Sequence, residues 1–281
     1  MESIRELRTI VEKKRSRELT PLKAAFYREP IQVFLTRLFL FLNVGQIQLG
    51  LLWLIVGIIG SVFFLSGNVK YGIVAIIFHY IQTILDGCDG QVARYNKKTK
   101  LTEEEDYKLA FQGLYLDRFQ HIVVDLFAMF FFAIGLYQIS GFISVLVAGV
   151  ILVMIRMYKR THELILNSVA QILKKRSKIL EQVRLKYTLA KEKPIGIKII
   201  LHLFWWIKNG KRLYILILIA HLFDLVFPYF FNSLTSALPL GLNFRICLIY
   251  YFALIGIIGL VIEVLDDIKY MYGILKIEKL A

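Results

Sequence analysis

The sequence contains too few cysteines for a protein that is held together by disulfides. Two are present in 281 residues, Cys88 and Cys247, and they do not form a CxxC metal motif. Low hydrophobicity, which marks disordered chains, is also absent, because 57% of the residues are hydrophobic. The composition therefore excludes a disulfide-stapled scaffold and a chain that is disordered throughout.

Acidic residues are scarce relative to basic ones. The chain has 35 Lys+Arg against 21 Asp+Glu, a net charge of +14 and a mean hydropathy of +0.61. A soluble protein this basic would normally bind nucleic acid, but its core would not need so large a surplus of apolar residues. We therefore expect the apolar residues to face a membrane, and we expect no nucleic-acid partner.

Charge-free runs predict how many times the chain crosses that membrane, because a crossing helix needs about 20 mostly apolar residues. Residues 126–155 carry no formal charge, and Ser140 and Gly141 mark a turn within them. We expect two helices there, one beginning near Gly113 and the other ending near Tyr158. The remaining apolar runs are residues 49–65 and 71–85, which are free of charge, and 213–231 and 246–265, which carry one acidic residue each, Asp224 and Glu263. The sequence thus predicts an all-α integral membrane protein with six transmembrane helices.

The positions of the cations predict the orientation, since short cytoplasmic loops retain Lys and Arg. If the N-terminus lies inside, the inner segments hold 33 of the 35 cations, and Lys70 and Arg245 lie on the other side. We therefore expect both termini in the cytoplasm. The inner connection of residues 159–212 is basic, and its portion 197–207, with Trp205 and Trp206, is amphipathic.

Four segments follow along the chain. Residues 1–42 form a cytoplasmic or interfacial segment, 43–158 contain helices 1–4, 159–212 form the basic cytoplasmic connection, and 213–281 contain helices 5 and 6 with a short cytoplasmic tail. Charges throughout the first 42 residues argue against a cleaved signal peptide. Apolar stripes there predict interfacial amphipathic helices on the inner leaflet, and a solvated charged helix is the alternative for residues 1–20. The stripe residues are Ile4, Leu7, Val11, Leu19, Phe34, Leu35, Leu38 and Phe39.

The densest group of charges inside an expected membrane helix is LDGCDGQVAR, residues 85–94. Asp86 and Asp89 are three residues apart, so they share a helix face, which Gly90, Ala93 and Arg94 continue. Small residues on this face let a ligand approach the backbone. Paired carboxylates suit a hard divalent cation, whereas a polar helix end in water is the plainer alternative.

The next helix carries a second set of polar residues at four-residue spacing. Gly113, Asp117, His121 and Asp125 lie on one face of GLYLDRFQHIVVD. The expected topology places the start of this helix beside the end of the previous one, so that Asp86, Asp89 and Asp117 lie at one depth. Three unpaired carboxylates would repel one another. A bound metal is therefore the economical explanation for the cluster.

These residues resemble the signature of the CDP-alcohol phosphotransferase family, also called CDP-alcohol phosphatidyltransferases, which reads D-x2-D-G-x2-A-R-x8-G-x3-D-x3-D. The chain supplies its members in order, and the resemblance is specific over residues 86–121. The matching positions are Asp86, Asp89, Gly90, Ala93, Arg94, Gly113 and Asp117.

The resemblance implies transfer of a phosphoryl-alcohol group, such as phosphatidyl, from a CDP-alcohol to a hydroxyl acceptor in phospholipid synthesis, with release of CMP. It implies two Mg²⁺ or Mn²⁺ ions held by Asp86, Asp89 and Asp117. It also implies a nucleotide pocket lined by Gly90, Ala93 and Gly113, with Arg94 on a phosphate, and a site that faces the cytoplasm. Membrane lipid would be a partner, and a homodimer is compatible with the family.

The chain departs from the family pattern in three places. His121 stands where the family has its fourth Asp, 18 residues rather than eight separate Arg94 from Gly113, and VGQIQ (residues 44–48) replaces P-N-x-[IV]-T. Four roles are open to His121: the base that deprotonates the acceptor, a metal ligand, a group that orients a carboxylate, or the mark of changed or lost activity. The alternatives to transfer are therefore a relative that binds nucleotide or lipid without it and, with less support, a transporter.

Other polar residues within the helices receive plainer interpretations. We expect His79 to be a satisfied interhelical histidine, and His221 and Asp224 to pair structurally within helix 5. Arg156, at the end of helix 4, is expected to be an anchoring cation, with binding of an acceptor phosphate as the alternative. Residues 95–112 are expected to form a charged loop.

Overall fold

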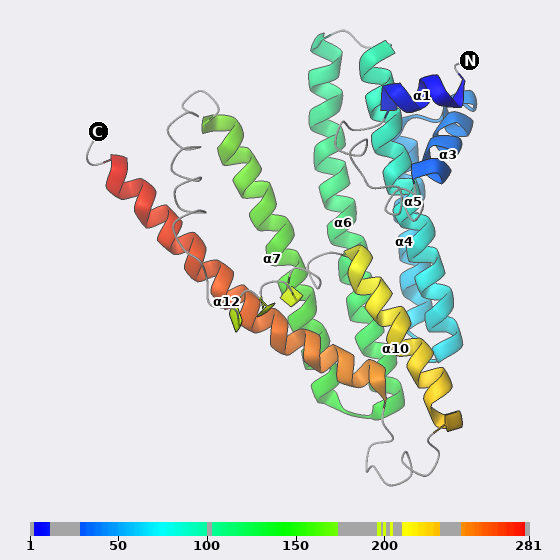
Figure 1. The fold of residues 1–281 in the computed structure, drawn as a ribbon, viewed down its shortest axis with the longest axis vertical. Helices are drawn as coiled ribbons and strands as arrows, with labels where there is room; N and C mark the ends of the chain where they lie inside the picture. The colour runs from blue at the N-terminus through cyan, green and yellow to red at the C-terminus, as the bar shows by residue number, and fades with distance from the viewer. Residues whose placement is uncertain are drawn as a thin grey trace. The chain divides into compact units, whose positions relative to one another are not determined.

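The computed structural model describes residues 3–11, 29–99, 103–173, 210–230 and 243–278, with a few residues between 196 and 204. All elements within these ranges are helices, as the composition predicts (Figure 1). They are α1 (Ile4–Val11), α3 (Glu29–Phe41), α4 (Gln46–Phe64), α5 (Val69–Thr99), α6 (Glu103–Ser140), α7 (Ile143–Leu173), α10 (Gly210–Phe230) and α12 (Phe244–Glu278).

Four stretches of helix are long and apolar enough to cross a membrane. They are Gln46–Phe64, Val69–Asn96, Leu116–Ser140 and Phe244–Ile262. The apolar stretches Ile143–Tyr158 and Leu213–Val226, where two further crossings are expected, are shorter. The helices are thus compatible with a multi-pass membrane protein, and six crossings stay a prediction.

The expected break at Ser140 and Gly141 is confirmed. Helix α6 ends at Ser140 and α7 begins at Ile143. Gly141 has a φ of 72°, a left-handed conformation that suits glycine, and its N–H donates a hydrogen bond of 2.7 Å to the carbonyl oxygen of Tyr137. This geometry ends a helix by satisfying one of its last carbonyl groups.

The described residues of the charged segment 95–112, which are 95–99 and 103–112, are helical and do not form the expected loop. Helix α5 continues to Thr99 and α6 begins at Glu103, so the added residues lengthen two helices. The basic connection likewise begins as helix, since α7 extends to Leu173. Most of the amphipathic portion expected at residues 197–207 lies outside the residues that the structure describes. Trp205 and Trp206 both lie outside them.

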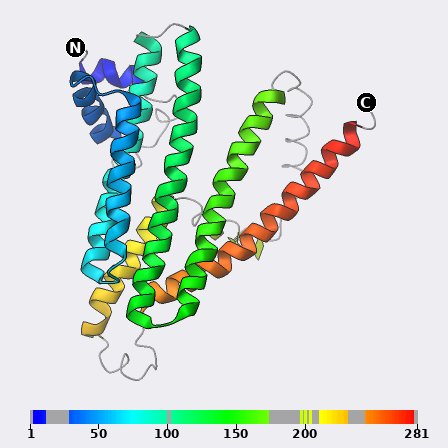
Figure 2. The ribbon, with the colours of Figure 1, turned by 180° about the vertical axis from the view of Figure 1, so that it is seen from behind.

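The chain divides into two compact units, the first formed by residues 1–64 and 70–128, the second by 65–69 and 129–281. In the first unit α4, α5 and the beginning of α6 run side by side in both views (Figures 1 and 2). Trp53 of α4, Leu85 of α5 and Val124 of α6 form a buried apolar cluster between these helices. This apolar cluster holds together the part of the unit that carries the motif residues.

Helix α1 begins with a capping box, in which the backbone N–H of Ser3 bonds the Glu6 carboxylate at 2.8 Å and the N–H of Glu6 bonds the Ser3 hydroxyl at 3.2 Å. Part of the apolar stripe of α1 packs against the protein itself. Leu7 and Val11 are buried against Val33 of α3. Lipid contact is therefore not the role of these two residues. Leu19 lies outside the described residues.

Helix α3 has two distinct faces. Gln32, Val33 and Thr36 are buried on one side, whereas the opposite side exposes large apolar residues at helical spacing. These exposed large apolar residues are Ile31, Phe34, Leu38 and Phe41.

In the second unit α12 packs against α7 and α10. Arg245, near the start of α12, is buried, and its Nε bonds Asp224 of α10 at 2.5 Å. Its Nη1 donates to the carbonyl oxygen of Gly67 at 2.6 Å, and Asp224 also accepts the backbone N–H of Phe244. The expected pairing of Asp224 with His221 is therefore wrong. His221 Nδ1 instead lies 2.7 Å from the carbonyl oxygen of Ile217, one turn earlier in α10.

We expect removal of one partner of this buried pair to destabilise the second unit. Asp224→Ala leaves the Arg245 guanidinium buried without its carboxylate, a change that costs about 3–5 kcal/mol. Thermal unfolding of the purified chain in detergent should show a clear fall in Tm. Lys70→Met is the control, because Lys70 is exposed and surface changes usually stay within about 0.5 kcal/mol. An unchanged Tm for Asp224→Ala would contradict the structural role of the pair.

Candidate functional site

The motif residues come from two neighbouring helices of the first unit. Helix α5 carries Asp86 and Asp89, and α6 carries Asp117 and His121. The chain reverses between Thr99 and Glu103, so α5 and α6 run side by side in opposite directions (Figure 1). The three-residue and four-residue spacings then place one face of each helix toward the other.

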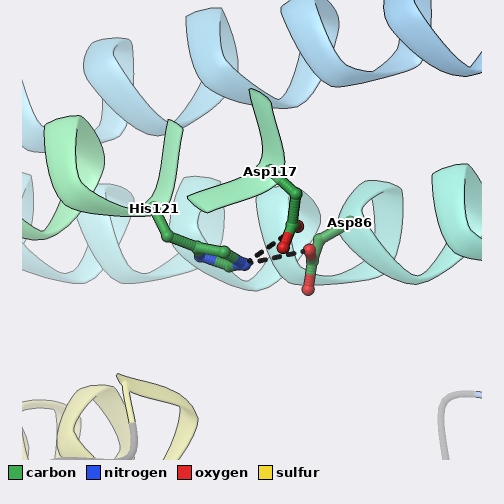
Figure 3. Close-up of side chains that lie close together, drawn as sticks. All are labelled: Asp86, Asp117 and His121. Atoms are coloured by element: carbon green, nitrogen blue, oxygen red, sulfur yellow. Dashed lines mark ion pairs between the residues drawn. The ribbon is translucent and has the colours of Figure 1, made fainter. Parts of the chain in front are cut away.

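Three of these side chains converge (Figure 3). His121 Nε2 lies 3.3 Å from Asp86 Oδ1 and 3.5 Å from Asp117 Oδ1. In the described part of the chain they form a group whose potential ligand atoms all lie within 4.8 Å of one another. Of the three aspartates expected at one depth, Asp86, Asp89 and Asp117, the structure brings Asp86 and Asp117 together with His121.

The group is neither deeply buried nor fully exposed. The side chains of His121, Asp86 and Asp117 are 21%, 18% and 34% exposed. A protonated imidazole would pair with both carboxylates, whereas a neutral imidazole would join them as a ligand of a divalent cation. Two carboxylates and one imidazole suit Mn²⁺ or Zn²⁺ better than Mg²⁺, which prefers oxygen ligands only. The residues present therefore fit a divalent metal.

Asp89, one turn after Asp86 on α5, is not a member of this group. It is 8% exposed, and its Oδ2 accepts a hydrogen bond of 3.1 Å from Trp53 Nε1 of α4. Trp53 is completely buried, and its ring centroid is 5.0 Å from that of His121. Trp53 could not be identified from the sequence, because a tryptophan in an apolar run gives no sign of which polar group its N–H will meet.

The residues expected around a nucleotide have mixed surroundings. Gly90 and Ala93 are half-buried on α5, and Gly113 lies within α6. Arg94 Nε donates a hydrogen bond of 2.6 Å to the carbonyl oxygen of Val11, the last residue of α1. Arg94 therefore stabilises the end of a neighbouring helix. Its contact with a phosphate stays a prediction.

The buried face of α3 packs against the motif segment of α5. Thr36 Oγ1 donates to Gln91 Oε1 at 2.8 Å, and Cys88 Sγ lies 3.5 Å from the carbonyl oxygen of Gln32. A Cβ added at Gly87 would lie 2.0 Å from Gln32 Nε2, so glycine allows this carboxamide to reach the α5 backbone. The polar positions of α3 could have indicated this contact, since they share a face opposite the apolar one.

The remaining polar residues support structure rather than the candidate site. His79 is buried, with Nε2 3.4 Å from Ser61 Oγ and Nδ1 3.3 Å from Gln82 Oε1, which confirms a satisfied interhelical histidine. Asp125 is also buried. Arg156 is 2% exposed within the second unit, and its role as an anchoring cation or as a phosphate contact stays a prediction.

The comparisons with known proteins assign no family: no family model matches the sequence, and no curated protein matches it.

Proposed function

We propose that the chain is an integral membrane CDP-alcohol phosphotransferase. It transfers a phosphoryl-alcohol group, such as phosphatidyl, from a CDP-alcohol to a hydroxyl acceptor and releases CMP. The observation that carries this proposal is the meeting of Asp86 with Asp117 and His121 across two helices, at positions that follow the motif of the family.

Each residue of the group has a role in this proposal. Asp86 and Asp117 hold a divalent cation, Mg²⁺ or Mn²⁺, with His121 beside them. A bound divalent cation neutralises phosphate charge and stabilises a leaving phosphate. Gly90, Ala93 and Gly113 line the nucleotide pocket, and Arg94 contacts a phosphate. The second ion and the participation of Asp89 stay predictions of the resemblance.

His121 is placed to accept the proton of the acceptor hydroxyl. The acceptor oxygen forms a bond to the phosphorus that carries the alcohol. The bond from this phosphorus to the bridging oxygen breaks, and CMP leaves with that oxygen. The proton passes to His121 Nε2, where the carboxylates of Asp86 and Asp117 stabilise the imidazolium.

The membrane placement follows from the same proposal. Six crossings place both termini and the motif on the cytoplasmic side, where anionic lipid attracts basic segments. The exposed apolar residues of α3 lie in the interface of the inner leaflet. A donor with lipid chains then stays in the membrane, and CMP leaves into water.

A second candidate is a relative that binds nucleotide or lipid without transfer. The pairing of His121 with two carboxylates favours it, because a protonated His121 would compete with a cation for the same oxygens. Binding of a CDP-alcohol without release of CMP at any Mn²⁺ concentration would support this candidate over the first.

Release of CMP tests the leading proposal. We expect the purified chain to release CMP from CDP-diacylglycerol or another CDP-alcohol when a hydroxyl acceptor and Mg²⁺ or Mn²⁺ are present. Asp117→Asn should lower the rate by at least about tenfold, since even partners of metal ligands contribute 10–100-fold. Asp267→Asn in α12, outside the motif, is the matched control. Equal rates for the wild type and Asp117→Asn would refute the site.

Replacement of His121 separates its roles. His121→Ala should lower kcat by about 10²–10⁴-fold, the usual contribution of a general base. His121→Asp should keep activity within about tenfold, because a carboxylate can also accept the proton. His162→Ala in α7 serves as the control, and CMP release is again measured. If His121→Asp is active and the wild type is not, the binding candidate replaces the enzyme.

Cysteine labelling distinguishes six crossings from four, the number of helical stretches that are long and apolar enough to cross a membrane. In a Cys247→Ser background, Lys70→Cys should react with an impermeant maleimide from outside right-side-out vesicles. Lys191→Cys, in the basic connection, should react after permeabilisation only. Four crossings would instead place residue 191 outside, so its labelling in sealed vesicles contradicts the six-helix topology.

A further inference from the structure

We propose that Trp53 is a positioning residue of the candidate site. Its N–H holds one oxygen of the Asp89 carboxylate, so that the other oxygen is presented to a bound cation. The inference deepens the proposed function and rests on it in taking the motif residues as the place where a cation binds. It concerns a residue of α4, whereas the motif lies on α5 and α6.

The first step is the hydrogen bond itself. Trp53 Nε1 donates to Asp89 Oδ2 at 3.1 Å. Trp53 has no exposed surface and Asp89 is 8% exposed, so water has little access to this bond. An indole N–H only donates and cannot ligate a metal, and a buried donor that loses its partner is unfavourable. The bond therefore restricts rotation of the Asp89 carboxylate.

The second step concerns the oxygen that this bond does not use. A carboxylate has two oxygens that accept hydrogen bonds or bind cations, and Trp53 contacts one of them. The N–H of a neutral indole does not compensate the charge of an ionised Asp89, and buried charges are paired or coordinate metals. Asp89 Oδ1 is therefore the atom that suits a cation. Carboxylates that ligate metals are commonly held in this way by a hydrogen bond from a residue that is not itself a ligand.

The third step is the location of Asp89 beside the residues that converge. The Trp53 ring centroid lies 5.0 Å from that of His121, and the N–H of the same indole reaches Asp89. Asp89 also follows Asp86 by one turn of α5. Trp53 thus contacts one motif residue on each of the two neighbouring helices. A change that removes only its N–H should act on the site through Asp89.

A double-mutant cycle on Mn²⁺ binding tests this role, with the full chain in lipid nanodiscs and without donor or acceptor. The Kd is measured from the electron paramagnetic resonance signal of free Mn²⁺. Trp53→Phe keeps a ring and removes the N–H, and it should raise the Kd about tenfold, as should Asp89→Asn. The two changes together should match Asp89→Asn alone to within about twofold, because Trp53 acts through Asp89. Trp205→Phe, the same substitution outside the motif, is the control.

A purely structural role of Trp53 predicts a different result. Loss of packing would weaken binding whichever residue stands at position 89, so the effects of Trp53→Phe and Asp89→Asn on the Kd would multiply. Multiplying effects would overturn the inference. So would an unchanged Kd in a folded Trp53→Phe chain, or a wild-type chain that binds no Mn²⁺.

The indole N–H signals give a second measurement that does not require Trp53→Phe to fold. Labelling the three tryptophans with ¹⁵N gives three indole signals, and Trp205→Phe with Trp206→Phe identifies the signal of Trp53 by elimination. This signal should move in Asp89→Asn, because a charged acceptor bonds more strongly than an amide. Saturating Mg²⁺ or Zn²⁺ should also move it in the wild type. A Trp53 signal that neither cation moves would overturn the positioning role.

The two proposals fail separately. A chain in which Trp53 and Asp89 are coupled in Mn²⁺ binding, but which releases no CMP from any CDP-alcohol, loses the transferase proposal and keeps this inference. A chain that releases CMP and whose Trp53→Phe variant binds Mn²⁺ as the wild type does loses this inference alone.

Discussion

The packing of Trp53 between α5 and α6 is the interaction on which the candidate site depends. Trp53 is completely buried and forms an apolar cluster with Leu85 and Val124, one residue from each neighbouring helix. A large side chain lost from such a position leaves a cavity that the surrounding helices cannot fully close. Leu85 directly precedes Asp86, and Val124 lies one turn from His121. The relative position of the two motif-bearing helices is therefore set by apolar packing just beside their polar groups.

The convergence of Asp86, Asp117 and His121 could be predicted from the sequence because two simple periodicities decide it. Residues three or four apart share a helix face, and a short reversal places two consecutive helices antiparallel. The Trp53–Asp89 bond was not predictable in this way. Helical spacing tells which face a residue occupies, but the partner of that face depends on how a third helix, α4, lies against the pair.

Helix ends were predicted less well than helix centres, for a physical reason. The charged residues 95–112 lie between two apolar runs, and the sequence suggested a loop there. Lys and Glu are nevertheless good helix formers, and Glu103 to Glu105 lie in the first turn of α6, where negative charge stabilises a helix. Hydropathy reports where a helix leaves lipid, whereas propensity and terminal charge decide where the helix ends.

Buried charges show the same limit of local patterns. His221 and Asp224 are one turn apart, which suggested a pair, but the His221 ring bonds its own helix at Ile217. Asp224 instead bonds Arg245, a cation assigned to an outer loop by hydropathy. Arg245 is buried because it has two partners, Asp224 and the Gly67 carbonyl, that lie far away in the sequence.

Helix α3 connects the proposed chemistry to the proposed membrane surface. Its exposed apolar face suits lipid, while Gln32 and Thr36 on the other face contact residues 87–91, which surround Asp89. A transferase whose donor carries lipid chains and whose product is soluble must place its phosphates where hydrocarbon ends and water begins. The proposed interfacial placement of α3 would meet this requirement, because α3 packs on the motif segment and its depth in the leaflet would then set the depth of the carboxylates on α5.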